Sequence, residues 1–272
     1  MPATRAAAAL AAPAAPAAGL LIVNADDWGR DRHTTDMIFD CIRRGAVQST
    51  SAMVFMEDSE RAATIAREQT VDAGLHLNFT TPFSAASVPA ALAEHQRTLI
   101  RYLRSYRLAQ VVFHPGLRRS FEYVVAAQLD EFRRLFGAEP HAIDGHHHMH
   151  LSANVLFQGL LPAGALVRRN FSFQAGEKGI LNRTYRSLMD GMLGRRHRTV
   201  DFLFSLAPIE PERLQRIFTL AERFVVELET HPVESDEYRY LAGGEIFHHI
   251  GNVQMGPHTL VSPNGLAERG HA

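Results

Sequence analysis

The chain has very little cysteine, with Cys41 alone among 272 residues. A single thiol excludes an internal disulfide framework and a cysteine-based zinc module. We therefore expect Cys41 to pack in the core. A lone cysteine also fits a reducing compartment, so we predict a cytoplasmic protein.

The sequence also lacks an excess of charge and a long apolar run. Its 28 Lys and Arg nearly balance 29 Asp and Glu, for a net charge of -1. This balance gives no field that would favour nucleic acid or an anionic membrane as a partner. Since no apolar run approaches the roughly 18 to 20 residues that a bilayer requires, we predict no membrane span.

Residues 1–18 differ in composition from the rest, being rich in alanine and proline. Because Pro13 and Pro16 interrupt a weakly apolar stretch, we predict a disordered extension. The alternative is an export signal. At its length the remaining chain, residues 19–272, suits one large domain.

Short apolar runs alternate with amphipathic segments along this domain. Such alternation predicts an α/β fold, with a mainly parallel sheet or barrel and helices outside it. In these folds the functional site lies at the carboxyl ends of the strands. The expected strands cover 19–29, 50–56, 73–79, 141–151, 200–206 and 224–231, and the expected helices cover 34–47, 59–69, 121–137 and 211–224.

Residues 144–150 read DGHHHMH, so four of the fifteen histidines fall on one short segment. If this segment is extended, Asp144, His146, His148 and His150 share one face. Neighbours on that face are about 6.6 Å apart and a metal bonds imidazole at about 2.1 Å, so one ion can take at most two of them. The alternative is a run of surface histidines.

Other strand ends offer Asp26, Asp27, His76 and His231 as further ligands. One carboxylate with two or three imidazoles suits Zn, Fe, Ni or Co. Adjacent residues on a regular strand point to opposite faces, so Asp26 and Asp27 can act together only if the backbone bends. One aspartate would then bind the metal, and the other would face the metal-bound water. Alternatively, either Asp caps the next helix, and either lone histidine is scaffold.

The motifs LLIVNADDWG, GAVQSTSAMV, AGLHLNFT, FRRLFGAEPHAIDGHHHMH and ELETHP follow one another along the chain. In this order and spacing the sequence resembles the YdjC-like carbohydrate deacetylase family. The resemblance implies a single-domain, distorted (β/α) barrel of the glycoside hydrolase/deacetylase type. It also implies one divalent metal ion, Zn or Mg, and a small N-acetylated carbohydrate substrate. A homodimer is a further expectation.

The same resemblance assigns roles by motif position. Asp27 corresponds to the metal carboxylate, and His76 and His146 correspond to its imidazole ligands. Asp26 corresponds to the general base, and His231 to the acid that protonates the leaving amine. Such a site would hydrolyse an acetamide, because a metal acidifies water and polarises the acetyl oxygen.

Some residues near these motifs stay outside the assigned roles. His148 and His150 are expected to support the ligands from behind or to face the substrate. Residues 164–198 carry eight Lys or Arg against two acids, which indicates a solvated face or, alternatively, an anionic group on the substrate. His114 imitates the His-Pro motif, but a helix follows it, so we assign it no role.

Two other functions remain open. Two histidines and a carboxylate also form the site of non-haem iron oxygenases, although those sites usually lie on all-β barrels. A non-catalytic carbohydrate-binding protein could share the barrel, since a fold alone does not determine function. The presence of Asp26 argues against this second alternative, because a binding protein needs no base beside a metal water.

Overall fold

The computed structural model describes residues 19–105, 108–172, 186 and 189–261. The predicted extension at 1–18 lies outside this part of the chain. Of the helices within it, none is both long and apolar enough to cross a membrane.

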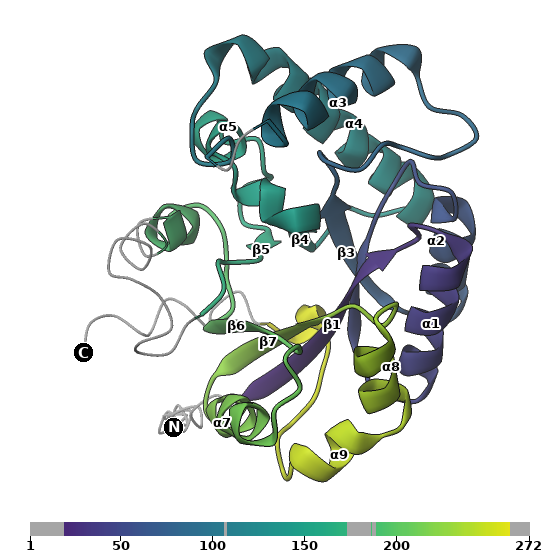
Figure 1. Ribbon diagram of the computed structural model, residues 1–272, viewed down its shortest axis with the longest axis vertical. Helices are drawn as coiled ribbons and strands as arrows, with labels where there is room; N and C mark the ends of the chain where they lie inside the picture. Colours follow the sequence, from purple (N-terminus) through teal and green to yellow (C-terminus); the bar gives the residue numbers. More distant parts are fainter. Residues whose placement is uncertain (1–18, 106–107, 173–185, 187–188, 262–272) are drawn as a thin grey trace, which may run out of the picture.

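Seven parallel strands form one sheet in the order β5-β4-β3-β2-β1-β7-β6, seen in Figure 1. Strand β1 lies in the interior of the sheet between β2 and β7 and is buried along its whole length, as expected for an interior strand of a parallel sheet. The strands are β1 (Leu20–Trp28), β2 (Ser49–Ala52), β3 (Asp72–Leu77), β4 (Ala142–Gly145), β5 (Leu166–Val167), β6 (Phe202–Ser205) and β7 (Val225–Thr230).

The two edges of this sheet approach each other. A parallel bridge joins Leu166 of β5 to Arg198, shortly before β6. Val167 N–H donates to the Arg198 carbonyl at 2.8 Å, and Ser172 N–H donates to the Leu203 carbonyl of β6 at 2.8 Å. The sheet therefore curls into the distorted, single-domain barrel that the sequence predicts.

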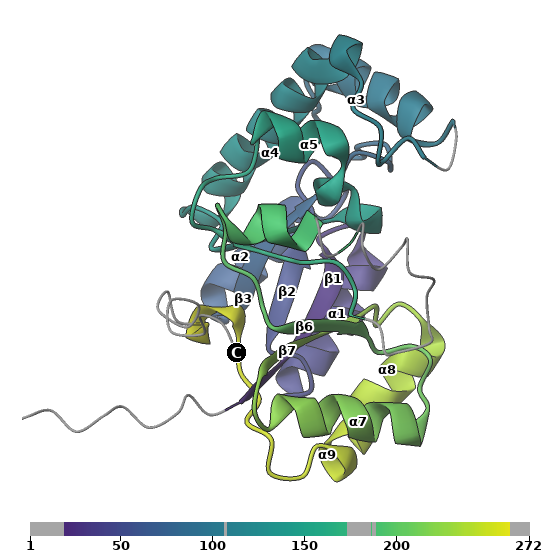
Figure 2. The ribbon, with the colours of Figure 1, turned by 90° about the vertical axis from the view of Figure 1, so that its left-hand side faces the viewer.

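Helices lie outside the sheet, and α3, α4 and α5 gather at one end of the molecule, as Figure 1 and Figure 2 show. The helices predicted over 34–47, 59–69, 121–137 and 211–224 all form, as α1, α2, α4 and α7. The helices are α1 (Arg32–Arg43), α2 (Ser59–Glu68), α3 (Ala90–Leu103), α4 (Arg118–Phe136), α5 (Ala153–Gln158), α7 (Pro211–Ala221), α8 (Ser235–Ala242) and α9 (Glu245–His249), with 3-10 turns η1 (Pro115–Leu117), η2 (His146–Leu151) and η3 (His258–Leu260).

Helix α4 illustrates how the sequence specifies these elements. One side of the helix buries apolar residues at helical spacing, among them Phe121, Val125 and Phe132. Gly137 then ends the helix in the left-handed conformation, with φ 72°, and its N–H donates to the Arg133 carbonyl at 2.9 Å. Cys41 is buried in the core, as predicted.

The predicted extended conformation of 144–150 is wrong beyond Gly145. Strand β4 stops there, and η2 begins at His146. His147 and His148 have φ 55° and 56°, so the chain turns through the left-handed region and the histidines do not alternate between two faces. The Gln110 amide holds this turn by donating to the His148 carbonyl at 2.9 Å.

Candidate metal and catalytic site

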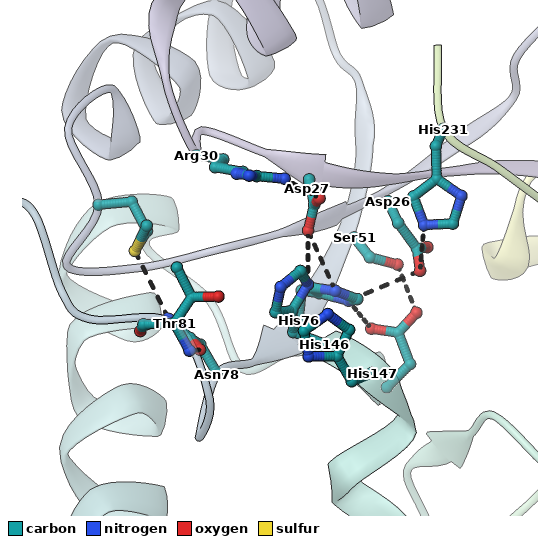
Figure 3. A network of polar contacts seen from close by, with 12 residues as sticks. Asp26, Asp27, Arg30, Ser51, His76, Asn78, Thr81, His146, His147 and His231 are labelled. Carbon is teal, nitrogen blue, oxygen red and sulfur yellow. Dashed lines mark hydrogen bonds and ion pairs between the residues drawn. The ribbon is translucent and has the colours of Figure 1, made fainter. Parts of the chain in front are cut away.

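The bend that would let Asp26 and Asp27 act together is present in β1. The pairing with β2 shifts by one residue between Ala25 and Trp28, as in a β-bulge. Asp27 has φ 70°, a conformation that a non-glycine residue adopts only at a cost. Both side chains consequently point into one region, as Figure 3 shows. Neither caps the next helix, since the Asp31 carboxylate accepts the Thr34 N–H at the start of α1.

Asp27, His76 and His146 meet at the carboxyl ends of the strands. Asp27 Oδ1 lies 3.0 Å from His146 Nδ1 and 3.4 Å from His76 Nε2. One ligand atom from each residue lies within 4.8 Å of the others. Asp27 Oδ1 is buried without a hydrogen bond. A buried, unsatisfied carboxylate oxygen between two imidazole nitrogens fits the ligand set of a divalent metal.

The surroundings orient His76 toward this place. Its Nδ1 lies 2.8 Å from Asp144 Oδ1, which leaves Nε2 facing Asp27. The Ser51 hydroxyl donates to the other Asp144 oxygen at 2.6 Å, and the Asn24 amide donates to Ser51 at 2.8 Å. A metal-binding histidine commonly gives its second nitrogen to a carboxylate in this way.

The electrostatics of the three residues favour positive charge at this place. Burial raises the pKa of Asp27, but contacts with His146 and His76 outweigh it and hold the pKa well below its usual range. Burial lowers the pKa of His76, but the carboxylates of Asp144 and Asp26 outweigh it and raise the pKa well above its usual range. The same negative charges would attract a metal cation.

A buried arginine, Arg168, lies behind the two aspartates. Its side chain pairs with Asp26 at 2.7 Å, Asp144 at 2.6 Å, Glu227 at 2.7 Å and Glu229 at 3.0 Å. Only 3% of the residue is exposed. One guanidinium thus connects carboxylates from three strands and fixes their positions.

Arg168 holds both oxygens of Asp26, at 2.7 Å each. The Asn24 amide adds a third hydrogen bond at 2.9 Å. On the open side, His231 Nε2 lies 3.9 Å from Asp26 Oδ2, with a third of the His231 side chain exposed. Burial raises the pKa of Asp26, and this outweighs the opposing effect of Arg168.

The prediction of a solvated face over 164–198 is therefore wrong at Arg168, which is buried and neutralised by carboxylates. The other described basic residues of that stretch are at least partly exposed, and they are Arg169, Arg186, Arg195, Arg196 and Arg198; Lys178 and Arg183 lie outside the described residues. The sequence feature that could have identified Arg168 is its position directly after Leu166 and Val167, the two apolar residues of β5. A charged residue at the end of a buried strand points to the same edge as the aspartates.

The other histidines differ in their relation to the site. His148 Nε2 lies 3.3 Å from Glu229 Oε2, beside the Arg168 cluster. His150 is fully buried and bonds the Arg168 carbonyl at 2.9 Å, so it supports that strand and does not face a substrate. His114 precedes η1, and its backbone N–H donates to Asn154, outside the site.

Comparison with known proteins finds a family match and several relatives. A family model described as YdjC-like protein matches residues 20–250. A chitooligosaccharide deacetylase of Proteus mirabilis is 36% identical over 134 residues, covering 49% of this chain and 51% of that protein. A carbohydrate deacetylase of Mus musculus is 30% identical over 145 residues, covering 50% of this chain and 44% of that protein. The chain thus spans about half the length of the curated relatives it matches.

A solved structure from Enterococcus faecalis V583, provisionally named a cellobiose-phosphate cleavage protein, has a similar fold. The TM-score is 0.62 at 19% identity, and the match covers 89% of this chain and 97% of that one. At this identity the likeness concerns the fold, and it supports the curled barrel that the strand pairing shows.

Proposed function

The chain belongs to the YdjC-like family, and from that premise we propose that it is a metal-dependent hydrolase that removes acetyl groups from N-acetylated sugars. One observation carries the proposal: a bulge in β1 presents Asp27 to His76 and His146 while presenting Asp26 beside them. Relatives named as chitooligosaccharide deacetylases support the same class of reaction.

Asp27, His76 and His146 would hold the divalent ion. Bound there, zinc or magnesium would act as a Lewis acid that polarises the acetyl oxygen and acidifies water. Imidazole ligands suit zinc better than magnesium, which prefers oxygen ligands.

The protein's own groups would move the protons. Asp26 would accept a proton from the attacking water, since its raised pKa makes it a stronger base than an ordinary aspartate. Arg168 would keep the Asp26 carboxylate in place through both of its oxygens. His231 would donate a proton to the sugar nitrogen as the C–N bond breaks. Its partial exposure leaves room for a sugar to approach.

Acetate release tests the proposal directly. The protein, loaded with Zn²⁺ or Mg²⁺, would be incubated with N-acetylglucosamine and di-N-acetylchitobiose, beside a chelated sample. We expect acetate only from the metal-loaded protein. His146→Gln should abolish the release, whereas His114→Gln, the same change outside the site, should not alter it. Sugar binding with no acetate from any metal-loaded sample would favour the non-catalytic carbohydrate-binding protein instead.

A second prediction concerns Asp144, which orients His76. Asp144→Asn should weaken metal binding by about 10- to 100-fold, because the neutral amide holds the imidazole less firmly. Titration of the metal-free protein with Zn²⁺ measures this change. Asp72→Asn is the matched control: Asp72 is also a carboxylate paired with a histidine, His141 at 3.1 Å, and its side chain is 9% exposed, but it lies at the opposite end of β3. Equal affinities for the two variants would contradict the proposed role.

Three expectations from the sequence remain: the iron oxygenase alternative, the homodimer and the cytoplasmic location. A parallel α/β sheet disfavours the non-haem iron oxygenase, whose sites usually lie on all-β barrels. The homodimer and the cytoplasmic location remain predictions.

A further inference from the structure

Most of the exposed large apolar side chains of the described residues lie on the α3–α4 connection, α4 and α5. Among the described residues, eight large hydrophobic side chains are exposed, and six of them lie between 108 and 157. The connection from α3 to α4 lies against α5 here: Ala153 N–H donates to the Gln110 carbonyl at 2.8 Å, and the Phe113 and Phe157 rings are 6.2 Å apart. The six residues, which we term the apolar rim, are Leu108, Val111, Val112, Phe113, Tyr123 and Phe157.

A groove of about 550 Å³ adjoins the apolar rim. Its apolar lining comes from Leu108, Val111, Leu151, Phe171 and Met189. Leu108 and Val111 belong to the rim and are 61% and 37% exposed, whereas Leu151 and Met189 are buried. A groove of this volume is large enough for a small organic ligand.

His147 and His148 also line the groove and connect it to the candidate site. The His147 ring lies 4.0 Å from the ring of His146, one of the three candidate metal ligands. His148 contacts Glu229 at 3.3 Å on one side and the Phe171 ring at 4.6 Å on the other. His147 and His148 thus lie between the candidate site and the groove, so a molecule whose acetamide lies among Asp26, Asp27 and His146 would reach the groove past these two rings.

The apolar side of the groove offers little to a second sugar ring. The polar side chains among its described lining residues are Gln110, His147, His148, Asn170 and Arg186. A sugar presents hydroxyl groups that need hydrogen-bond partners when they leave water. Two of the polar side chains in the lining are already engaged, since the Gln110 amide donates to the His148 carbonyl and the Asn170 amide donates to Asp190. Leu108, Val111 and Met189 supply no partner. Burial of an apolar chain against them, by contrast, is favourable.

From the position of the groove beside the candidate site and from its apolar lining we infer that the groove binds an apolar group attached to the N-acetylated sugar. The substrate is then an amphiphile, with its acetamide at the metal site and an alkyl or lipid chain along Leu108, Val111 and Phe171. This inference rests on the proposed function and specifies its substrate class.

Three glycosides test the inference: methyl N-acetyl-β-glucosaminide, its octyl counterpart and di-N-acetylchitobiose. Each buried methylene strengthens binding roughly fourfold. We therefore expect kcat/KM for the octyl glycoside to exceed that for the methyl glycoside by at least about tenfold. Leu108→Ser should reduce this ratio by about threefold or more. Leu260→Ser is the matched control, since Leu260 is 55% exposed but lies in η3, and it should leave the ratio unchanged.

Equal rates for the octyl and methyl glycosides, with di-N-acetylchitobiose preferred, would overturn the inference and leave the deacetylase intact. Acetate from none of the three would overturn the proposed function. Binding of octyl β-glucoside, which has no acetamide, to the metal-free protein tests the groove separately by calorimetry. We expect it to bind more tightly than methyl β-glucoside and to lose that advantage in Leu108→Ser. Equal binding of the two would again overturn the inference.

Discussion

Replacing Arg168 with methionine is expected to lower the free energy of unfolding by about 3–5 kcal/mol at pH 7. The arginine is 3% exposed, and its guanidinium neutralises Asp26, Asp144, Glu227 and Glu229. Methionine would fill much of the space but would leave the four carboxylates buried without their cation. Urea unfolding of the two proteins measures the difference.

The difference should shrink as the pH falls. In the native protein, burial raises the pKa values of Asp144, Glu227 and Glu229, but Arg168 and the neighbouring histidines together outweigh burial and lower all three, that of Glu229 to about 2. Carboxylates with lowered folded pKa values stabilise the fold above their unfolded values of about 4, and this contribution disappears as the pH falls toward about 2. Without Arg168, burial would raise these pKa values above the unfolded ones, so protonation would stabilise the variant. Arg168→Met should therefore lose less unfolding free energy, relative to the unchanged protein, at pH 5 than at pH 7.

Arg169→Met is the matched control for Arg168→Met. Arg169 is the next residue and also pairs with an acid, Asp190 at 2.8 Å, but its side chain is 26% exposed and the pair lies near the surface. Pairs of that kind contribute about 0–1 kcal/mol. If both variants lose the same small amount of unfolding free energy at pH 7 and at pH 5, the charge of Arg168 is not needed to stabilise the carboxylates around it.

The elements that could be predicted from the sequence are those with a regular period. The stripe that ends at Gly137 predicted α4, and the alternation around His76 predicted β3. Helix α3 was not predicted, although Leu92, Gln96, Leu99 and Leu103 are buried on one side of it. The polar Gln96 within this buried side weakens the apolar pattern. Its amide is needed there to donate to the Thr81 carbonyl at 2.9 Å.

The candidate site was predictable as a set of strand ends but not in its local geometry. Parallel strands bring their carboxyl ends together, so Asp27 and His76 were expected to meet. The left-handed turns at Asp27, His147 and His148 could not be predicted, because strained backbone persists only where the surrounding structure holds it. Arg168 was missed although its place after the apolar pair of β5 marks a strand end, because only the fold brings its carboxylate partners together. Its partners come from β1, β4 and β7, and nothing near it in the sequence indicates them.

Asp26→Asn is expected to lower kcat for acetate release by about 10²- to 10⁴-fold, the usual contribution of a general base. Asparagine has nearly the same shape, and its amide oxygen can still accept one of the two hydrogen bonds from Arg168. It cannot accept a proton from water at neutral pH. The rate should therefore fall while the protein remains folded, and initial rates with the best acetylated substrate measure the change.

Metal content separates the role of Asp26 from that of its neighbour. Asp26 also belongs to two other groups that could hold a metal, with Glu229 and His231 or with His76 and Asp144. If the ion binds at Asp27, His76 and His146 as proposed, Asp26→Asn should bind Zn²⁺ with nearly unchanged stoichiometry. Asp27→Asn should lose both the metal and the activity, since the buried Oδ1 between the two imidazoles would no longer belong to a carboxylate. If instead Asp26→Asn lost the metal and Asp27→Asn kept it, the two aspartates would have exchanged roles. If Asp26→Asn kept both metal and full activity, another group would be the base, and the bulge in β1 would serve only to aim Asp27.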